Sequence, residues 1–444
     1  MTNQHKPDFD AIIVGAGLSG LTAAYALAKG GLSVAVLERG GYPGAKNLFG
    51  GILFSTILNR LIPNFWNEAP VERHIIKRRF SYLTDKTEVG FDFKTERFNT
   101  PPYNNSFTVL RAQFDRWFAR KAEDAGAAIY TEVVVDDFIY ENGGVTGIKA
   151  RGSAENEYDE LRANVVICAE GANSMLAEAS GLRSGKSRMS GRNRAVAVKE
   201  IISLPQELIE DRFNLSAGEG AAIEYFGDAV KNMMGSGFVY TNKNTISVGV
   251  GCTIEDAANN KIALYDLLDH FKDHFAIKGL VKDGVALEYS AHLIPEDSYD
   301  NLPGLITDGL ILVGDAAGLA NSSFYHEITN LAMASGLYAA ETVIEANKTK
   351  DFSKKALAPY VDKLKNSFVL KDMRQYRNFT GFIHKNKQFL TAYPELFCNS
   401  IVDYFTVTEM PKSKIKKSVF KQAIKKINIL KFAIDILRAV RNLI

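Results

Sequence analysis

The stretch AIIVGAGLSGLTAAYALAKGGLSVAVLER, residues 11–39, predicts how the first part of this chain folds. It opens with an apolar run that is typical of a buried parallel strand. The glycines Gly15, Gly17 and Gly20 follow at once in the spacing GxGxxG, and an alanine-rich helical pattern comes next. A second apolar run then ends in an acid, Glu38. Strand, glycine turn, helix, strand and acid in this order predict a dinucleotide-binding βαβ unit.

Each part of this unit has a physical task. Gly15 allows the tight turn, Gly17 leaves the backbone open to a pyrophosphate, and Gly20 lets the helix pack closely on the sheet. The free N–H groups at the start of the helix attract phosphates, and Glu38 can accept hydrogen bonds from an adenosine ribose. An ordinary glycine-rich turn is the alternative, and the complete context weighs against it. The motif alone does not decide between FAD and NAD.

A late segment, GLILVGDAAG at residues 309–318, helps to decide between these dinucleotides. It is a buried-strand pattern that ends in Gly314-Asp315, where a carboxylate can bind the hydroxyls of a ribityl chain. A helical pattern then runs from about Glu327 to Ala346. The N-terminus of this helix would face the pyrimidine edge of a flavin, where it stabilises negative charge. An N-terminal GxGxxG…E with a distant Gly-Asp pair favours FAD over NAD.

Length and composition bound the class of protein. A chain of 444 residues suggests two or three domains, and 46% apolar with 23% charged residues is typical of a globular protein. The net charge of +2 gives no reason to expect nucleic acid as a partner. The N-terminus is polar and lacks a signal core, and no apolar run is long enough to span a bilayer. We expect a cytoplasmic protein and leave contact with a membrane surface open.

The three cysteines, Cys168, Cys252 and Cys398, are far apart in the sequence. Their number and spacing fit a reducing compartment and argue against a disulfide framework. They also exclude an iron–sulfur cluster that this chain alone would hold through four cysteines. We expect no metal site.

Two further segments are candidates for cofactor contact. The glycine-rich loop GGYPGAKNLFGG, residues 40–51, follows the first βα unit and would lie beside the cofactor. A flexible surface loop is the alternative, and the apolar Leu48 and Phe49 between its glycines weigh against it. Arg111 stands at a predicted strand-to-helix junction, where a cation can reach a phosphate or a ribityl chain. An arginine that is simply exposed fits the pattern equally well.

The last segment is basic and amphipathic. Residues 411–444 contain ten Lys or Arg and one acid, Asp435, and their apolar residues lie roughly along one helical face. Such a segment suits an anionic membrane surface or an acidic partner. A terminal helix docked on its own domain is the alternative.

The motifs carry a family resemblance. GAGLSGLTAA with Glu38, VVICAEGANS and LILVGDAAG resemble the glutathione-reductase-type flavoproteins of the p-hydroxybenzoate hydroxylase and geranylgeranyl reductase group. FixC proteins, which are relatives of electron-transfer-flavoprotein:quinone oxidoreductase, are a more specific match. The segments that look like FixC proteins are PGAKNLFGG (43–51), VLRAQFDRWF (109–118), VKEIISLPQELIEDRFNL (198–215), NLAMASGLYAAE (330–341) and the C-terminal stretches at 351–354, 371–374 and 393–396. The resemblance covers essentially the whole chain.

This resemblance implies an electron relay. FixC-type proteins hold one non-covalent FAD, take electrons from an electron-transferring flavoprotein (the FixAB or EtfAB pair) and pass them towards a quinone, menaquinone or ubiquinone. A ferredoxin-like subunit, FixX, accompanies them, and some of their complexes bifurcate electrons. The quinone oxidoreductase carries a [4Fe–4S] domain in its own chain, whereas this chain has three cysteines. We therefore expect a separate iron–sulfur partner and a cytoplasmic protein that is peripheral on the inner face of the cell membrane.

The resemblance also implies a fold and its boundaries. We expect an α/β fold with a Rossmann-type, glutathione-reductase-like FAD-binding domain, an inserted antiparallel β-sheet domain for the substrate or quinone, and a helical, basic C-terminal region. The expected segments are 1–185 for the first part of the FAD-binding domain (with a hairpin insertion at about 70–105), 186–295 for the inserted domain, 296–347 for the closing part, and 348–444 for the helical region with its tail at 411–444.

By position, the resemblance implies a set of cofactor contacts. The ADP half would bind at Gly15, Ala16, Gly17, Leu18, Ser19, Gly20, Glu38 and Arg39. Lys46, Asn47, Gly50 and Gly51 would lie near the isoalloxazine, Arg111 near a phosphate or the ribityl chain, and Gly314 and Asp315 at the ribityl chain. Glu327, Ile328, Thr329 and Asn330 would lie near the pyrimidine ring. Here the chain departs from the family: Ile328 stands where we expect glycine, and it adds bulk beside the flavin.

Three functions stay open. The main hypothesis is the flavin relay to a quinone, in which the flavin does the chemistry and no catalytic side chain is needed. His326 could relay protons, and as a plain loop residue it would look the same. The second is another enzyme, a geranylgeranyl-reductase-like prenyl reductase or a flavin monooxygenase. The third is a docking subunit for the membrane or a partner. No second GxGxxG follows a strand, so we expect no independent NAD(P)H site.

Overall fold

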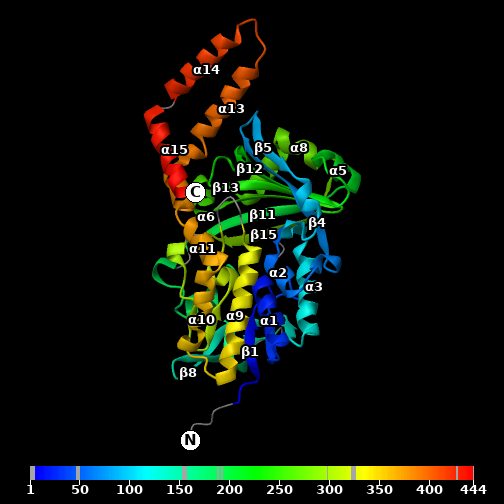
Figure 1. Cartoon of the computed structure of the whole chain (residues 1–444), viewed down its shortest axis with the longest axis vertical. Helices are drawn as coiled ribbons and strands as arrows, with labels where there is room; N and C mark the ends of the chain where they lie inside the picture. The colour runs from blue at the N-terminus through cyan, green and yellow to red at the C-terminus, as the bar shows by residue number, and fades with distance from the viewer. Residues whose placement is uncertain are drawn as a thin grey trace.

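We describe the protein from a computed structural model over residues 6–46, 51–152, 158–187, 190–191, 194–297, 299–321, 327–426 and 429–443. It has the expected α/β fold. Two large sheets lie one above the other along the long axis, and the C-terminal helices run up one side of both (Figure 1). The candidate site is positioned mainly by how these two sheets face each other.

The first sheet contains the predicted βαβ unit. Its strands follow the order β16-β17-β10-β1-β2-β7, and every pair is parallel except β16 with β17. The predicted apolar runs form its central strands because both of their faces are buried. The strands are β1 (Phe9–Val14), β2 (Val34–Glu38), β7 (Ala128–Thr131), β10 (Tyr158–Cys168), β16 (Ile306–Thr307) and β17 (Leu310–Leu312).

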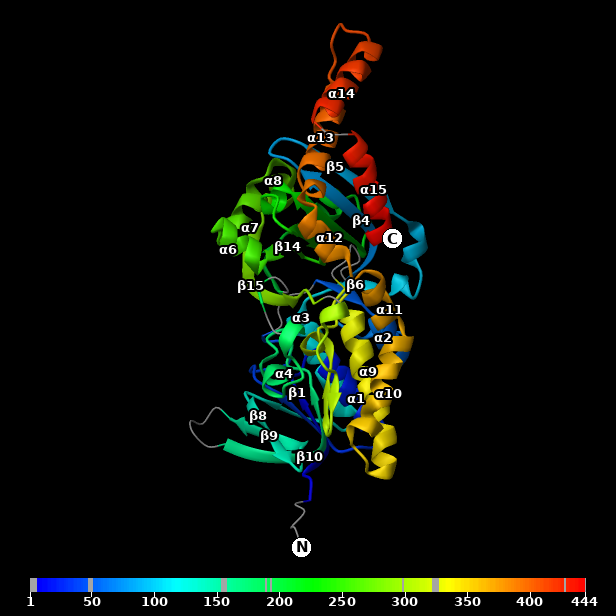
Figure 2. The same cartoon turned by 90° about the vertical axis from the view of Figure 1, so that its left-hand side faces the viewer.

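Helices cover one side of this sheet and a three-stranded meander of β8, β9 and β10 lies on the other (Figure 2). The covering helices pack closely because small residues stand between them: a Cβ on Gly336 would lie 2.1 Å from the carbonyl oxygen of Ser19. These elements are α1 (Leu18–Lys29), α3 (Arg111–Asp124), α9 (Thr329–Thr349), α10 (Lys354–Asn366), α11 (Phe368–Gln375), α4 (Met175–Ala179), β8 (Val134–Glu141) and β9 (Gly144–Arg151).

The second sheet follows the order β15-β11-β14-β13-β12-β4-β6-β3, with β5 paired to β4. It is antiparallel except for the pair of β12 with β4. The hairpin expected at 70–105 is formed by β4 and β5, and it belongs to this sheet rather than to the first. The strands are β3 (Ile52–Phe54), β4 (Val71–Leu83), β5 (Glu88–Lys94), β6 (Ser106–Val109), β11 (Arg194–Ser203), β12 (Glu219–Gly227), β13 (Gly235–Thr241), β14 (Thr245–Thr253) and β15 (Val285–Pro295).

The two faces of the second sheet have different neighbours. One face packs its branched and aromatic residues against helices, around Val239, Val248 and Phe271. The alternate residues face the first sheet and the candidate site. The short helix α2 (Thr56–Leu61) follows β3, and the covering helices are α5 (Gln206–Phe213), α6 (Ile254–Asn260), α7 (Leu264–Asp273) and α8 (Phe275–Val281).

The C-terminal region forms two parts rather than one continuous tail. Helices α13 and α14 make a hairpin that projects beyond the second sheet in both views (Figures 1 and 2). Helix α15 then returns and contacts α12. In the described part of the chain, no helix has the length and apolarity needed to cross a membrane. The elements are α12 (Phe379–Lys385), the 3-10 turn η8 (Lys387–Phe389), α13 (Ala392–Phe405), α14 (Lys412–Lys426) and α15 (Ile429–Leu443).

Candidate functional site

The glycine turn after β1 has the geometry that a phosphate-binding turn needs. Gly15 has φ +102°, and a Cβ there would lie 2.4 Å from the carbonyl oxygen of Ala169. A Cβ on Gly20 would lie 2.0 Å from the carbonyl oxygen of Gly15. Gly17 precedes α1 in extended conformation, so the free N–H groups of the helix start open towards the adjoining cavity. Backbone contact therefore explains why these positions carry glycine.

Glu38 holds this turn against the end of β2. One carboxylate oxygen accepts a hydrogen bond from the backbone N–H of Ala16 at 2.9 Å, and the other accepts one from Gly40 at 2.7 Å. The side chain is buried, while the neighbouring Arg39 is exposed. The acid thus joins the two strands of the βαβ unit at the position where an adenosine ribose is expected.

Asp315 is a carboxylate that lines the adjoining cavity. It follows β17 in a 3-10 turn that starts at Gly314, whose φ of +60° and whose contact with Ser19 leave no room for a side chain. The hydroxyl of Ser335 accepts the Gly314 N–H at 2.8 Å and fixes the turn. Burial raises the pKa of Asp315 to about 6, although the charges of Arg111 and Arg194 oppose this rise. The cavity therefore carries an acid that is costly to ionise without a polar ligand.

Arg111 begins α3 and lines the same cavity, but it already has a partner. Its Nε and Nη2 donate to the two carboxylate oxygens of Asp115, each at 2.8 Å, and both side chains are buried. Burial raises the pKa of Asp115, and the Arg111 guanidinium opposes this. The pairing is a helical i,i+4 contact. It orients the guanidinium and keeps its remaining N–H groups available for the cavity.

The start of α9 is tied to β3 and α2 by its polar side chains. The Thr329 hydroxyl accepts the N–H of Phe54 at 2.9 Å, and the Asn330 side-chain oxygen accepts the N–H of Ile57 at 3.1 Å. Asn330 also donates to the Glu327 carboxylate at 2.8 Å. Glu327, Thr329 and Asn330, three of the predicted cofactor contacts, therefore also hold the N-terminus of α9 beside β3.

Ile328 lines the cavity directly before α9. Its backbone has φ −116°, a conformation that any residue adopts, and its carbonyl accepts the N–H of Ala332 at 2.9 Å. The departure from the expected glycine is thus a matter of side-chain bulk and leaves the backbone conformation unstrained.

Asn47, Gly50 and His326 lie outside the described residues. Lys46 is exposed, and Gly51 lines the cavity beside the Tyr240 ring.

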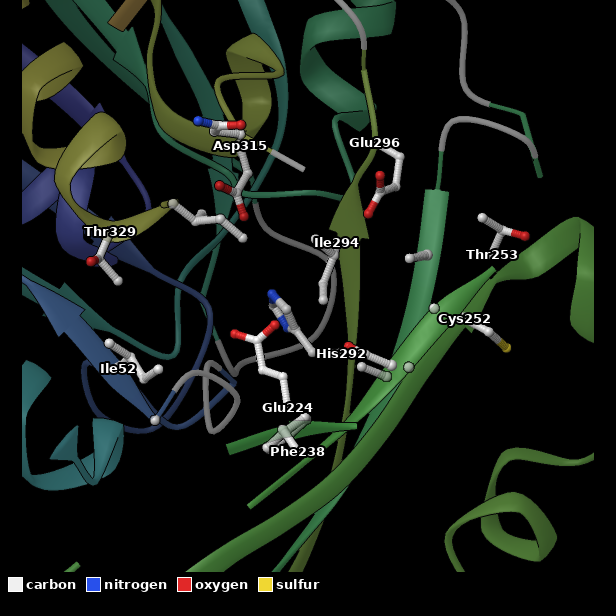
Figure 3. A pocket seen from close by; sticks show the side chains of 18 of the residues that line it. Ile52, Glu224, Phe238, Cys252, Thr253, His292, Ile294, Glu296, Asp315 and Thr329 are labelled. Carbon is white, nitrogen blue, oxygen red and sulfur yellow. The ribbon is translucent and has the colours of Figure 1, made fainter. Parts of the chain in front are cut away.

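Most of these segments open onto one cavity of about 520 Å³ between the two sheets, whereas Glu38 and Lys46 do not line it (Figure 3). One wall is the first sheet's carboxyl edge with Gly17, Asp315 and Ile328. The opposite wall is the second sheet, where small residues on β11 and β14 make a hollow: Ala195, Ala197 and Gly251. The cavity then continues to an apolar wall in the C-terminal region, made by Phe379, Ile383, Phe389, Leu390 and Pro394.

The sequence patterns missed the polar residues of the second sheet. Glu224 on β12 and His292 on β15 both reach into the cavity (Figure 3). Burial lowers the pKa of His292 to about 4, and the positive charges of Arg111, Arg39 and Lys199 lower it further, so the imidazole is neutral at pH 7. The alternation of apolar and polar residues predicted the strands of this sheet. It did not show which face of the sheet would meet the cofactor.

Helix α15 supports the apolar wall from behind. Its Ala439 packs against Phe382 and Ile383 of α12. The buried Asp435 accepts hydrogen bonds from the Tyr393 hydroxyl at 2.7 Å and from the Gln388 side chain at 2.9 Å. The single acid of the basic tail is therefore the residue that docks it.

The described residues fit a flavin dinucleotide. A glycine turn with a helix N-terminus suits the pyrophosphate, and Glu38 lies beyond it. Asp315 lines the cavity, and much of the remaining lining is apolar, as a flat ring system requires. The first sheet would supply the dinucleotide end, and the interface between the two sheets would supply the ring end.

Comparison with family descriptions and known proteins agrees with this fit. The ETF-QO/FixC family C-terminal domain matches residues 379–444, and the Thi4 family matches residues 4–72. FixC of Azotobacter vinelandii is 43% identical over 417 residues, which cover 94% of both chains. FixC of Escherichia coli K12 is 39% identical over 433 residues, which cover 97% of this chain and 98% of the relative.

Solved structures show the same fold. A geranylgeranyl bacteriochlorophyll reductase-like protein from Thermoplasma acidophilum superposes with a TM-score of 0.71 at 23% identity, over 94% of this chain and 99% of that one. The myxobacterial halogenase CndH, an FAD-dependent halogenase, gives a TM-score of 0.61 at 18% identity, over 86% and 92% of the two chains. By its similarity to the FixC relatives over nearly its whole length, this chain belongs to the FixC family of FAD-dependent oxidoreductases that act in electron transfer linked to electron-transferring flavoproteins.

Proposed function

We propose that this protein accepts electrons on its FAD from an electron-transferring flavoprotein pair, FixAB or EtfAB, and passes them to a quinone. The observation that carries the proposal is the shape of the cavity, which continues from Asp315 and Ile328 to the apolar wall of Phe379 and Leu390. A quinone has a polar head that must approach the flavin and an apolar tail that must leave it. A polar inner end and an apolar outer end match these two needs.

FAD supplies the redox chemistry when bound, because it can accept and release two electrons. The residues of the chain bind and orient it. The predicted contacts Glu38, Asp315 and Arg111 would hold the adenosine, the ribityl chain and a phosphate. The helix start at Thr329 would favour negative charge at the nearby ring edge. Ile328 would narrow the space beside the ring and restrict which acceptors reach it.

A membrane surface completes this proposal. Large apolar side chains stand in solvent on the projecting α13–α14 hairpin and on α15: Phe397, Phe405, Val407, Met410, Phe420 and Leu437. Lys412 and Lys416 lie within 5.5 and 5.9 Å of the Tyr404 ring on the same hairpin. Exposed aromatic residues with neighbouring lysines favour an anionic lipid surface. The protein would thus be peripheral on the inner face of the membrane that holds its quinone.

FixX is the proposed iron–sulfur partner. Cys168, Cys252 and Cys398 are all buried and free, and they come from separate elements. A second subunit would supply a cluster that these cysteines do not. Electron bifurcation would need this partner together with the EtfAB pair.

Mixing the purified holoprotein with a reduced EtfAB pair tests the main proposal. We expect the bound FAD to be reduced in stopped-flow absorbance and then reoxidised by a menaquinone or ubiquinone analogue. FAD that the pair leaves oxidised, together with turnover of a prenyl substrate or of oxygen, would instead identify a prenyl reductase or a monooxygenase. Bleaching of the FAD by NADH without a partner would contradict the expectation of no independent nicotinamide site.

Flotation with anionic vesicles tests the membrane part. The double variant Phe405→Ser/Val407→Ser should lose most vesicle binding while it keeps activity with a water-soluble quinone. The matched control, Val285→Ser/Leu287→Ser, removes two exposed apolar residues from β15 and should float like the wild type. Equal flotation of both variants would refute the assignment of the hairpin to the membrane. Loss of FixX co-purification in the first variant alone would show a partner-docking hairpin.

A further inference from the structure

A buried carboxylate stands in the second-sheet wall of the cavity. Glu224 comes from β12, is only 2% exposed and lines the cavity together with its strand neighbour Phe226. Figure 3 shows its carboxylate directed into the open space. The residues on either side of it in the strand point into the hydrophobic core behind the sheet. Strand alternation therefore puts Glu224 and Phe226 at the inner surface of β12.

Aromatic side chains lie next to Glu224. In the sheet register Glu224 lies beside Phe238 of β13, whose ring stacks on Tyr240 at 4.7 Å. Burial raises the pKa of Tyr240, the negative charge of Glu224 adds to this rise, and the charge of Arg78 opposes it. A buried carboxylate that lines a cavity beside aromatic rings is a candidate functional group.

The other ionisable groups of the cavity are less suited to deliver a proton. His292 is neutral at pH 7, because burial and the charges of Arg111, Arg39 and Lys199 lower its pKa to about 4. Asp315 belongs to the wall expected to bind the ribityl chain. Glu296 lines the cavity as well, directly after the end of β15. Among the described acids that line the cavity, Glu224 is the one that lies within a strand of the second sheet.

We propose that Glu224 is a catalytic residue that donates protons to the quinone, an inference that rests on the proposed quinone function. Reduction of a quinone adds one electron pair and two protons. Bound reduced FAD would supply the electron pair; both carbonyl π bonds of the ring are lost, and two O–H bonds form. The Glu224 carboxyl gives its proton to one quinone oxygen, takes a proton from solvent and gives it to the second oxygen. A second solvent proton restores the carboxyl, so the quinone gains one electron pair and, in net terms, two protons from solvent.

The test compares acceptors that do and do not need protons. Glu224→Gln removes the exchangeable acid proton and keeps the shape of the side chain. With an EtfAB pair as donor, we expect quinone reduction to fall about 100-fold or more. Reduction of ferricenium, a one-electron acceptor that takes no proton, should stay within about twofold. The solvent deuterium isotope effect on quinone reduction should rise in the variant, because proton delivery becomes limiting.

Controls separate this role from a structural one. Glu200→Gln removes a carboxylate from the opposite face of the same sheet, where it pairs with Lys272, and should leave quinone reduction near wild type. Glu224→Asp should restore much of the rate, since it restores the acid. Quenching of tryptophan fluorescence by a quinone analogue should show that Glu224→Gln still binds the acceptor.

The outcomes decide the inference separately from the proposed function. A wild type that reduces ferricenium but no quinone would refute the quinone proposal itself. A wild type that reduces quinone, with Glu224→Gln equally fast, would overturn the role of Glu224 alone. Equal slowing of ferricenium and quinone would also overturn it, because that pattern marks a structural defect. Should the Gln variant lose FAD, Glu224→Ala, which also removes the acid, carries the same comparison of acceptors.

Discussion

Small residues occur around the cavity on both sides, but for different reasons. Behind its first wall, in the glycine turn and in helices α1 and α9, Gly15, Gly20 and Gly336 occur where one backbone touches another, with Cβ positions 2.0 to 2.4 Å from carbonyl oxygens. On the second sheet, Gly251 meets chiefly the side chain of Ala197, at 2.9 Å, and the two together leave a hollow. The first wall uses glycine to bring backbone close, and the second uses it to leave space.

This difference separates two kinds of function. A wall built on backbone contact tolerates little change, and it is tied to a cofactor whose phosphates need N–H groups. A wall built on missing side chains can be reshaped by one methyl group at a time. We therefore expect changes in the first wall to act on FAD and changes in the second to act on the acceptor.

The largest effect should follow Gly20→Val. The added side chain would collide with the Gly15 carbonyl and displace the glycine turn. We expect a loss of about 3 kcal/mol in the free energy of unfolding and of most bound FAD. Thermal melting and the flavin absorbance of the purified protein measure the two losses. A variant that retains full FAD would contradict the division between the walls.

Asp315→Asn should have a smaller effect, and it should act in opposite directions on stability and on binding. Burial raises the pKa of this carboxyl to about 6, so its ionised form costs free energy in the folded apoprotein. The folded state is therefore favoured below the ordinary pKa of 3.8, and that advantage is lost as the pH rises through about 6. At pH 7.5 the variant apoprotein should be about 2 kcal/mol more stable than the wild type.

The same variant should hold FAD less tightly, since it removes the expected ribityl contact. Melting curves of the stripped proteins at pH 4 and pH 7.5 test the first statement, with the two proteins alike at the lower pH. Equilibrium titration with FAD tests the second. Tighter FAD binding by Asp315→Asn would argue against a role for this carboxylate in the cofactor site.

Gly251→Ala tests the second wall. Its methyl group would press on Ala197 and fill part of the hollow. We expect a cost of about 1 kcal/mol in stability and a raised KM for the quinone, while FAD content and reduction by EtfAB stay unchanged. Steady-state kinetics with quinone and with ferricenium distinguish these effects. A loss of FAD would show that the two walls are not separable.

The smallest effect should come from Asp435→Asn, behind the apolar wall. The change weakens the hydrogen bonds from Tyr393 and Gln388, at a cost of about 1 kcal/mol. We expect faster protease cleavage around α15. Those hydrogen bonds lower the pKa of the wild-type carboxyl, so its contribution holds at neutral pH and is lost as the pH falls through the lowered value. The cleavage rates of the two proteins should therefore converge on acidification.

The two walls also differ in how far the sequence predicts them. The βαβ unit, Glu38 and the Gly314-Asp315 turn could be predicted because their spacing along the chain is fixed by backbone geometry. The hairpin of β4 and β5 could be predicted as well, but the sheet that it joins could not, because pairing with β12 is a contact between residues about 140 positions apart. The cofactor contacts of the individual residues stay predictions.

The second wall has no such signature. Ala197, Gly251, Glu224 and His292 belong to four strands, and only the order of those strands brings them to one surface. Arg111 lies between the two cases. Its place at the start of α3 was predictable, and Asp115 four residues later was a visible partner, but the burial of both side chains depends on the surrounding helices.

The docking of α15 has a consequence for the order of synthesis. The strands and the glycine turn of the first wall lie early in the chain, and Asp315 with α9 completes the expected dinucleotide site by about residue 349. The apolar wall, however, gains its support from Asp435 and Ala439. Because domains form as the chain leaves the ribosome, the FAD site can assemble while the acceptor end still lacks its backing. The proposed acceptor end is therefore completed after the dinucleotide end.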